Sequence, residues 1–277
     1  MNHTILFLRI TSICLVVSCT AFNAGLFAQI RYSTGAVSVY IANGCGGPDL
    51  PLCVPEAYDV QAWYSMAGLP RVSAWENADV WGSDFVNTGG GDLESQGGSD
   101  LPEVYFYSGH GICQNPPMAN SADFLAVCGN NGPNNVNIGA NSRWGNGTGN
   151  LRFALIDASC PMDLVSLGNQ WWPTFQGLHV ATGHSGTSTA DALDSRSRGA
   201  NLASLSSGAL WLIPHLSVGN AWMQAGTIDI QTGCCAVVVA TGDTEADAVN
   251  RRDNERIRDN WSDPSGTTWL AWRWICR

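Results

Sequence analysis

The amino-acid sequence predicts one α/β domain with a mostly parallel central sheet covered by helices. Several short apolar runs, rich in β-branched and aromatic residues, lack the polar alternation of half-exposed strands, which is typical of strands buried on both faces. Late in the chain these runs alternate with segments of helical spacing, the pattern of βαβ units. Apolar residues make up 45% of the 277 residues and charged residues only 13%, so the chain can bury a substantial core.

The same pattern predicts each element along the chain. Strands are expected at residues 36–42, 104–107, 153–156, 178–182 and 236–240. Helices are expected at residues 161–175, 199–212, 218–225 and 244–258. Residues 87–100, with five glycines, and residues 129–150, rich in Asn and Gly, predict loops. The region that holds Cys45 and Cys53 is expected to lie against the domain.

Residues 1–28 predict a secretory signal peptide. Arg9 is the only charged residue before Arg31, residues 10–17 are apolar, and small residues follow at which cleavage can occur. A second interpretation is a bacterial lipoprotein signal, in which Cys19 carries a lipid anchor. The apolar run is too short for a membrane-spanning helix. We therefore expect a single domain over residues 29–277 that is secreted or held in the bacterial cell envelope, in the periplasm or outside the cell.

The charged residues exclude several classes of function. All 13 basic residues are Arg. A chain without Lys cannot form a Schiff base, bind pyridoxal phosphate through one, or supply the lysine of a Walker A loop or a protein kinase. The 23 acidic residues give a net charge of −10, which opposes binding to nucleic acid.

Cysteine usage agrees with export. The signal peptide takes two of the ten cysteines, and the eight that remain should mostly pair in an oxidising compartment. Close spacing suggests Cys45 with Cys53, Cys113 with Cys128, and Cys276 with Cys234 or Cys235. This scheme leaves Cys160 and one of Cys234 and Cys235 without a partner. Sequence alone leaves the connectivity open. No CxxC pair occurs, so neither a metal site nor a cofactor is predicted.

Two of the predicted strands end in residues that carry chemistry. Residues 104–107 run into SGHG, which places His110 between two glycines, and residues 153–156 run into DASCP, which contains Cys160. Neighbouring parallel strands lie about 5 Å apart, so the imidazole and the thiol would share one crevice if these strands pair. A helix starting at Pro161 and a nearby imidazolium would lower the pKa of the thiol toward the thiolate that attacks carbonyl groups.

The segments VYFYSGHG and FALIDASC resemble the two motif strands of the caspase-like (clan CD) cysteine peptidases, the group of caspases, metacaspases, legumains and gingipains. Their separation of roughly 50 residues is the spacing seen in caspases. The caspase pentapeptide Q-A-C-x-G is absent, so the chain does not resemble a caspase proper. Residues 175–183, 197–203 and 217–222 are similar to an uncharacterised bacterial family within that fold, domain of unknown function 6345.

This resemblance implies a caspase-like three-layer sandwich and a cysteine peptidase acting on a peptide or protein. It implies that Cys160 is the nucleophile, that His110 transfers protons, and that the backbone N–H groups of Gly111 and Cys160 form the oxyanion hole. Metacaspases place an Asp of D-[SA]-C in the specificity pocket. Asp157 is a candidate for that pocket although an extra residue separates it from Cys160, and His184 is a candidate for the crevice rim.

Simpler interpretations compete with this one. His110 can be a turn histidine and Cys160 a buried cysteine, and a disulfide between Cys113 and Cys160 would silence the site or make it redox-gated. The segment GHSGT at residues 183–187 approximates the G-x-S-x-G elbow of α/β-hydrolases, with His215 as base, but Thr replaces the final Gly.

A third class of function is a non-catalytic secreted binding protein, in which exposed indoles stack on a peptide or a carbohydrate. The chain contains 12 Trp, including Trp171, Trp172, Trp269, Trp272 and Trp274. We interpret these as packing aromatics of the core. A planar row of exposed rings would instead favour the binding protein.

Overall fold

The computed structural model describes most of the predicted domain. It covers residues 29–43, 45, 47–86, 98–113, 123–127, 135–139, 142–145, 149–188, 193–209, 215–228, 230, 232–266 and 268–277. The predicted signal peptide, with Cys19, and much of the two predicted loops lie outside the described residues. No helix in the described part is long and apolar enough to cross a bilayer.

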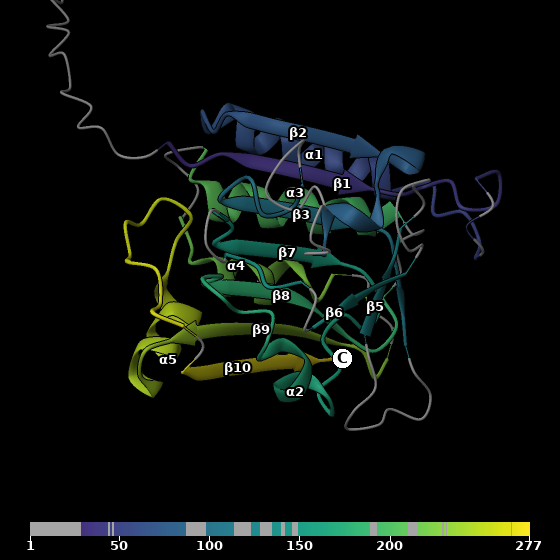
Figure 1. The fold of residues 1–277 in the computed structure, drawn as a ribbon. Coiled ribbons are helices and arrows are strands. Elements are labelled where there is room, and N and C mark those ends of the chain that lie inside the picture. The colour runs from purple at the N-terminus through teal and green to yellow at the C-terminus, as the bar shows by residue number, and fades with distance from the viewer. Residues whose placement is uncertain are drawn as a thin grey trace, which may run out of the picture.

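A seven-stranded sheet forms the centre of the domain, in the order β10-β9-β8-β7-β3-β1-β2 (Figure 1). Its strands are β1 (Tyr32–Ala36), β2 (Arg71–Glu76), β3 (Val104–Ser108), β7 (Phe153–Asp157), β8 (Val180–Ser185), β9 (Cys235–Gly242) and β10 (Trp269–Cys276). The five neighbouring strands β2, β1, β3, β7 and β8 are parallel to one another. β9 is antiparallel to both of its neighbours. The predicted α/β class with a mostly parallel sheet is confirmed.

Helices cover one face of this sheet. The α-helices are α1 (Cys53–Met66), α2 (Leu167–Trp171), α3 (Leu193–Ser207), α4 (Val218–Ala225) and α5 (Glu245–Asn254), and short 3-10 turns span Asn77–Asp79 and Gly82–Asp84. In Figure 1, α1, α3 and α4 lie behind the sheet. On that side Val104 and Phe106 of β3 join one apolar cluster with residues of α1, α3 and α4, including Val60 and Trp222.

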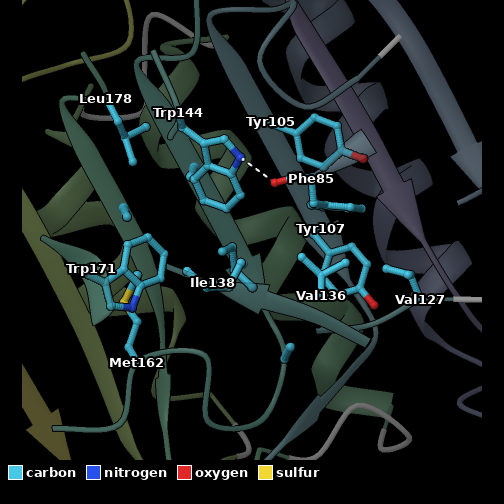
Figure 2. Packing of buried hydrophobic residues seen from close by; sticks show 14 of the residues in the cluster. Phe85, Tyr105, Tyr107, Val127, Val136, Ile138, Trp144, Met162, Trp171 and Leu178 are labelled. Atoms are coloured by element: carbon cyan, nitrogen blue, oxygen red, sulfur yellow. Dashed lines mark hydrogen bonds between the residues drawn. The ribbon is translucent and has the colours of Figure 1, made fainter. Parts of the chain in front are cut away.

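A smaller antiparallel sheet and α2 cover the opposite face. The small sheet contains β4 (His110–Ile112), β5 (Asp123–Ala126) and β6 (Asn135–Ile138). Figure 2 shows Tyr105 and Tyr107 of β3 among Phe85, Val136 and Trp144 on this face. Because residues of β3 pack alternately into two apolar layers, the strand has no polar face, which explains the unbroken apolar run in the sequence.

Several predicted boundaries are wrong. The first strand is β1, which ends at residue 36 where the predicted strand began, and its small polar residues hid it from the apolar pattern. The helix predicted over residues 161–175 shrinks to α2, and the one predicted over 199–212 begins earlier, at Leu193. The prediction for residues 218–225 coincides with α4. Sequence reasoning missed α1, β2, β10 and the small sheet.

Candidate functional site

The two motif strands are neighbours, and their following loops touch. β3 pairs in parallel with β7 from Val104 opposite Phe153 to Ser108 opposite Asp157. Just beyond, the N–H of Gly109 donates to the carbonyl of Asp157 at 3.2 Å. A Cβ added to Gly111 would overlap the backbone of Ser159, so the chain after His110 packs directly on the chain before Cys160. The two motif strands therefore pair as the sequence argument required, and the loops that carry His110 and Cys160 are in contact.

Residues of the segment that follows β1 hold His110 in place. It opens β4, its backbone N–H donates to the hydroxyl of Tyr40 at 2.7 Å, and its ring packs edge-on against the Tyr40 ring. The Nε2 atom lies 2.8 Å from the carbonyl oxygen of Pro48. Because a carbonyl only accepts hydrogen bonds, this contact places a proton on Nε2 and leaves Nδ1 of the neutral ring as the basic nitrogen.

Cys160 is oxidised rather than free. Its sulfur is bonded to that of Cys113, which follows β4 three residues after His110. The predicted pairing of Cys113 with Cys128 is therefore wrong. Cys160 itself has a left-handed backbone with φ of +58°, a costly conformation for a residue other than glycine, and is only 6% exposed.

The other cysteines correct the remaining predicted pairs. Cys53 is a free, buried thiol, so it does not pair with Cys45, which is itself disulfide-bonded. Cys276 pairs with Cys235, one of its two expected partners, and ties β10 to β9. The topology decided these pairs because it folds β4 back over the end of β7, which brings together cysteines 47 residues apart.

The described structure lacks the helix that was expected to start beside Cys160, and the implied oxyanion donor at Cys160 is already hydrogen-bonded. No helix starts at Pro161, because turns lead from there to α2, which begins at Leu167. The N–H of Cys160, an implied oxyanion donor, donates to the carbonyl of Gly186 at 3.0 Å. Gly111, the other implied donor, lies in β4 opposite Leu125 of β5.

Asp157 and His184 lie beneath the site, not on a pocket wall. Both side chains are fully buried, and Asp157 binds the guanidinium of Arg198 through contacts of 2.8 and 3.1 Å. His184 Nε2 lies 3.3 Å from Asp157 Oδ1. Burial alone would raise the pKa of Asp157, but Arg198 and His184 outweigh it and hold the pKa below its usual range. Burial lowers the pKa of His184. Because both side chains are buried, Asp157 does not line a pocket and His184 does not reach a crevice rim in the described structure.

A second buried carboxyl lies in the same region. Glu56 of α1 accepts a hydrogen bond from the hydroxyl of Ser108 at 2.6 Å and one from the N–H of Gly199 at 2.9 Å. Burial first, and then the negative charge of Asp157, raise the pKa of Glu56 well above its usual value. Sequence reasoning missed Glu56 and Arg198, because nothing in the local pattern marks a charged residue whose partner is distant in the chain.

The free thiol of Cys234 is also sealed inside the protein. Its sulfur lies 3.9 Å from His184 Nδ1, so Cys234, His184 and Asp157 form a row like that of a catalytic triad. All three are buried, and burial raises the pKa of Cys234 to about 11. A protonated thiol without access to solvent cannot serve as the nucleophile, so this row is structural.

The hydrolase elbow does not form, because Ser185 is the last residue of β8 rather than the tip of a strand-to-helix turn. His179, just before β8, is fully buried against Glu255 and so does not reach the surface near His110.

The exposed indoles gather on one surface, contrary to their prediction as core residues. Trp172, Trp269, Trp272 and Trp274 are between 40% and 51% exposed, whereas Trp171 is buried. Three of them line a pocket of about 560 Å³ between α2 and the edge strand β10. Its walls are Gly168, Asn169, Trp172, Pro173, Thr268, Trp269, Leu270 and Trp272.

A second cavity, of about 350 Å³, lies at the N-terminal ends of the parallel strands, opposite the end that carries His110. Glu103 and Arg152, which precede β3 and β7, line it. The described residues contain no group of three side chains suited to hold a metal ion.

Comparison with known proteins gives a family without a described activity. A family model described as Domain of unknown function (DUF6345) matches residues 44–274, which include both His110 and Cys160. No curated protein matches the chain.

Proposed function

Since the chain belongs to the family of domain of unknown function 6345, whose description names no activity, we propose its function from the site: a caspase-like cysteine peptidase in which reduced Cys160 attacks a peptide carbonyl and His110 transfers protons. The observation that carries the proposal is the contact between the two motif loops, with β3 beside β7 and Gly111 packed on Ser159. The caspase-like affiliation of the fold is part of the same proposal.

The proposed reaction uses the tautomer that Pro48 selects. Nδ1 of His110 takes the proton of the Cys160 thiol, and the thiolate attacks the carbonyl carbon. The imidazolium then gives this proton to the leaving amine, and water hydrolyses the thioester with His110 again as base. The hydrogen bond from Nε2 to the Pro48 carbonyl orients the ring.

The oxyanion hole requires one rearrangement. Gly111 and Cys160 are the implied N–H donors, and the Cys160 N–H must leave the Gly186 carbonyl to reach a substrate oxygen. Each such donor is typically worth about 2.7–4 kcal/mol of transition-state stabilisation. The left-handed backbone of Cys160 favours a local change at this residue once its sulfur is free.

We further propose that this peptidase acts outside the bacterial cytoplasm, on peptide or protein substrates. The sequence of residues 1–28 supports export, as do disulfides at Cys113–Cys160 and Cys235–Cys276, which persist in oxidising compartments. The lipid anchor at Cys19 stays a prediction.

The test compares reduced parent protein with Cys160→Ala and His110→Ala, using quenched fluorescent peptides and alkylation by iodoacetamide. We expect Cys160→Ala to abolish cleavage and His110→Ala to slow it by about 10²–10⁴-fold. Cys234→Ala and His215→Ala are the matched controls, because they remove a cysteine and a histidine outside the pair, and both should retain activity. Alkylation of Cys160 in the folded parent no faster than in denatured protein would refute the proposal.

A second candidate function rests on the pocket between α2 and β10. Its three indoles are about half exposed, and none of the described residues that line it is ionisable. Such a lining suits a neutral ligand with flat apolar faces, such as an oligosaccharide. We expect tryptophan fluorescence to respond to neutral oligosaccharides in the parent and in Trp63→Ala, which lies on α1. The response should be lost in Trp269→Ala and Trp272→Ala. A flat titration of the parent would exclude this function.

A further inference from the structure

We propose that the Cys113–Cys160 disulfide is a reversible switch, closed by oxidation and opened by a dithiol reductant. This inference rests on the proposed function, in which Cys160 is the nucleophile. The bond joins that nucleophile to the strand that carries the base, because Cys113 follows His110 by three residues. While it exists there is no thiol to attack a substrate, so the oxidised protein described above is the inactive form.

The two cysteines differ in their exposure to solvent. Cys113 is half-buried, whereas Cys160 is only 6% exposed. A reducing thiolate therefore reaches Cys113 first. In thiol–disulfide exchange the attacked sulfur forms the mixed disulfide, and the other sulfur leaves as a thiolate. Attack at Cys113 makes Cys160 the leaving group, which delivers the nucleophile directly in its thiolate form on the loop that packs against the chain following His110.

The step balances with a dithiol as the co-reactant. One thiolate of the reductant bonds to Cys113 Sγ as the Cys113–Cys160 bond breaks, and Cys160 leaves with the electron pair. The second thiol of the reductant then attacks the mixed disulfide and releases Cys113. The reductant ends as a disulfide, and its two electrons and two protons reduce the two cysteines.

The loops that the bond joins are also held by other contacts, so opening it does not require unfolding. The hydrogen bond from the N–H of Gly109 to the carbonyl of Asp157 and the packing of Gly111 on Ser159 do not involve the sulfurs, so we expect both to hold the loops together when the bond opens. The free thiols of Cys53 and Cys234 are buried, so neither competes for exchange.

This arrangement predicts which partner activates the protein. An oxidising compartment keeps the bond closed by default. Activation then requires a protein of the dithiol oxidoreductase class, or a reducing environment, and not proteolysis of the chain.

The test places the parent, Cys113→Ser and Cys276→Ser in buffers that range from oxidised to reduced dithiothreitol. Alkylation of Cys160 is read by mass spectrometry, cleavage by a fluorescent peptide, and the fold by circular dichroism. We expect the parent to pass from no labelling at Cys160 to full labelling as the buffer becomes reducing, with an unchanged fold and with cleavage rising in parallel. Cys113→Ser should label fully and cleave without reductant, whereas Cys276→Ser, which opens the Cys235–Cys276 disulfide, should still require it.

Two results separate failure of the switch from failure of the peptidase. If Cys160 in the parent becomes reactive only when the circular dichroism signal of the fold is lost, the bond is structural and the switch is refuted. If Cys160 opens in the folded parent but no peptide is cleaved, the peptidase proposal fails while the redox opening stands. The parent alone decides both outcomes, so they do not depend on the folding of Cys113→Ser.

Discussion

Replacing Arg198 with methionine should destabilise the domain far more than the same change at Arg196, two residues away on α3. Arg198 and its partner Asp157 are completely buried, whereas the side chain of Arg196, paired with Asp59, is 47% exposed. Both arginines hold their carboxylates through two nitrogen atoms. The comparison therefore isolates burial from the geometry of the pair.

The expected magnitudes follow from what each change leaves behind. Removing Arg198 leaves the Asp157 carboxylate in the interior beside His184 and Glu56, without its arginine partner. Losing one member of a buried pair costs about 3–5 kcal/mol of the free energy of unfolding. Removing Arg196 exposes Asp59 to water, so that loss should be at most about 1 kcal/mol. Adding Asp157→Asn to Arg198→Met should recover part of the larger loss, since no charge is then buried.

The pH dependence has a definite sign. The folded-state pKa of Asp157 lies below its unfolded value of about 3.9, so the pair stabilises the protein above that pH and loses its effect as the pH falls through the folded pKa. Without Arg198 we expect burial to raise the folded pKa of Asp157 above 3.9. The stability difference between parent and variant should then shrink from pH 7 toward pH 4, because protonation removes the buried charge. Glu56, which faces the same cluster, already favours its neutral form.

Urea unfolding of the parent, Arg198→Met and Arg196→Met, with the disulfides intact, measures these differences at several pH values. Two outcomes would contradict the reasoning. One is a loss below about 1 kcal/mol for Arg198→Met at pH 7, which is the range of an exposed pair. The other is a difference that grows as the pH falls.

Three further changes test the fold around the site, each followed by thermal or urea unfolding. Gly111→Ala should cost about 1–3 kcal/mol through overlap with Ser159, whereas Gly168→Ala, which meets nothing within 4 Å, should be neutral or stabilising; equal effects would contradict the close packing. Cys276→Ser should cost about 4 kcal/mol by opening the loop between β9 and β10. Thr244→Ala should cost about 1 kcal/mol by removing the N-cap of α5, and Thr244→Ser should restore it.

Some elements were predictable because their burial shows in the types of consecutive residues. β3 and β7 are buried on both faces, and each begins with four consecutive apolar residues that the sequence displays. α1 was not predictable in this way. It buries Glu56 and Gln61 and exposes Tyr58 and Met66, so its apolar stripe is broken by residues whose burial depends on distant partners.

The tryptophans show that local sequence can also predict burial for residues that the fold leaves exposed. Residues 269–274 have the composition of a core strand, and the sequence does not indicate that β10 is the edge of the sheet. Only strand order leaves Trp269 and Trp272 open to solvent beside α2. The interpretation as core residues failed for that reason, although Trp171 and Trp222 are buried as expected.

By itself, the sequence determined the α/β class, the two strands that end near His110 and Cys160, and the absence of lysine chemistry, because burial and residue type are local properties. Tertiary structure decided that Cys160 pairs with Cys113, that Pro48 contacts His110, and that Asp157 binds Arg198. Each of these contacts joins residues more than 40 positions apart. Their formation depends on which strands become neighbours, and residue type and spacing along one chain do not specify that.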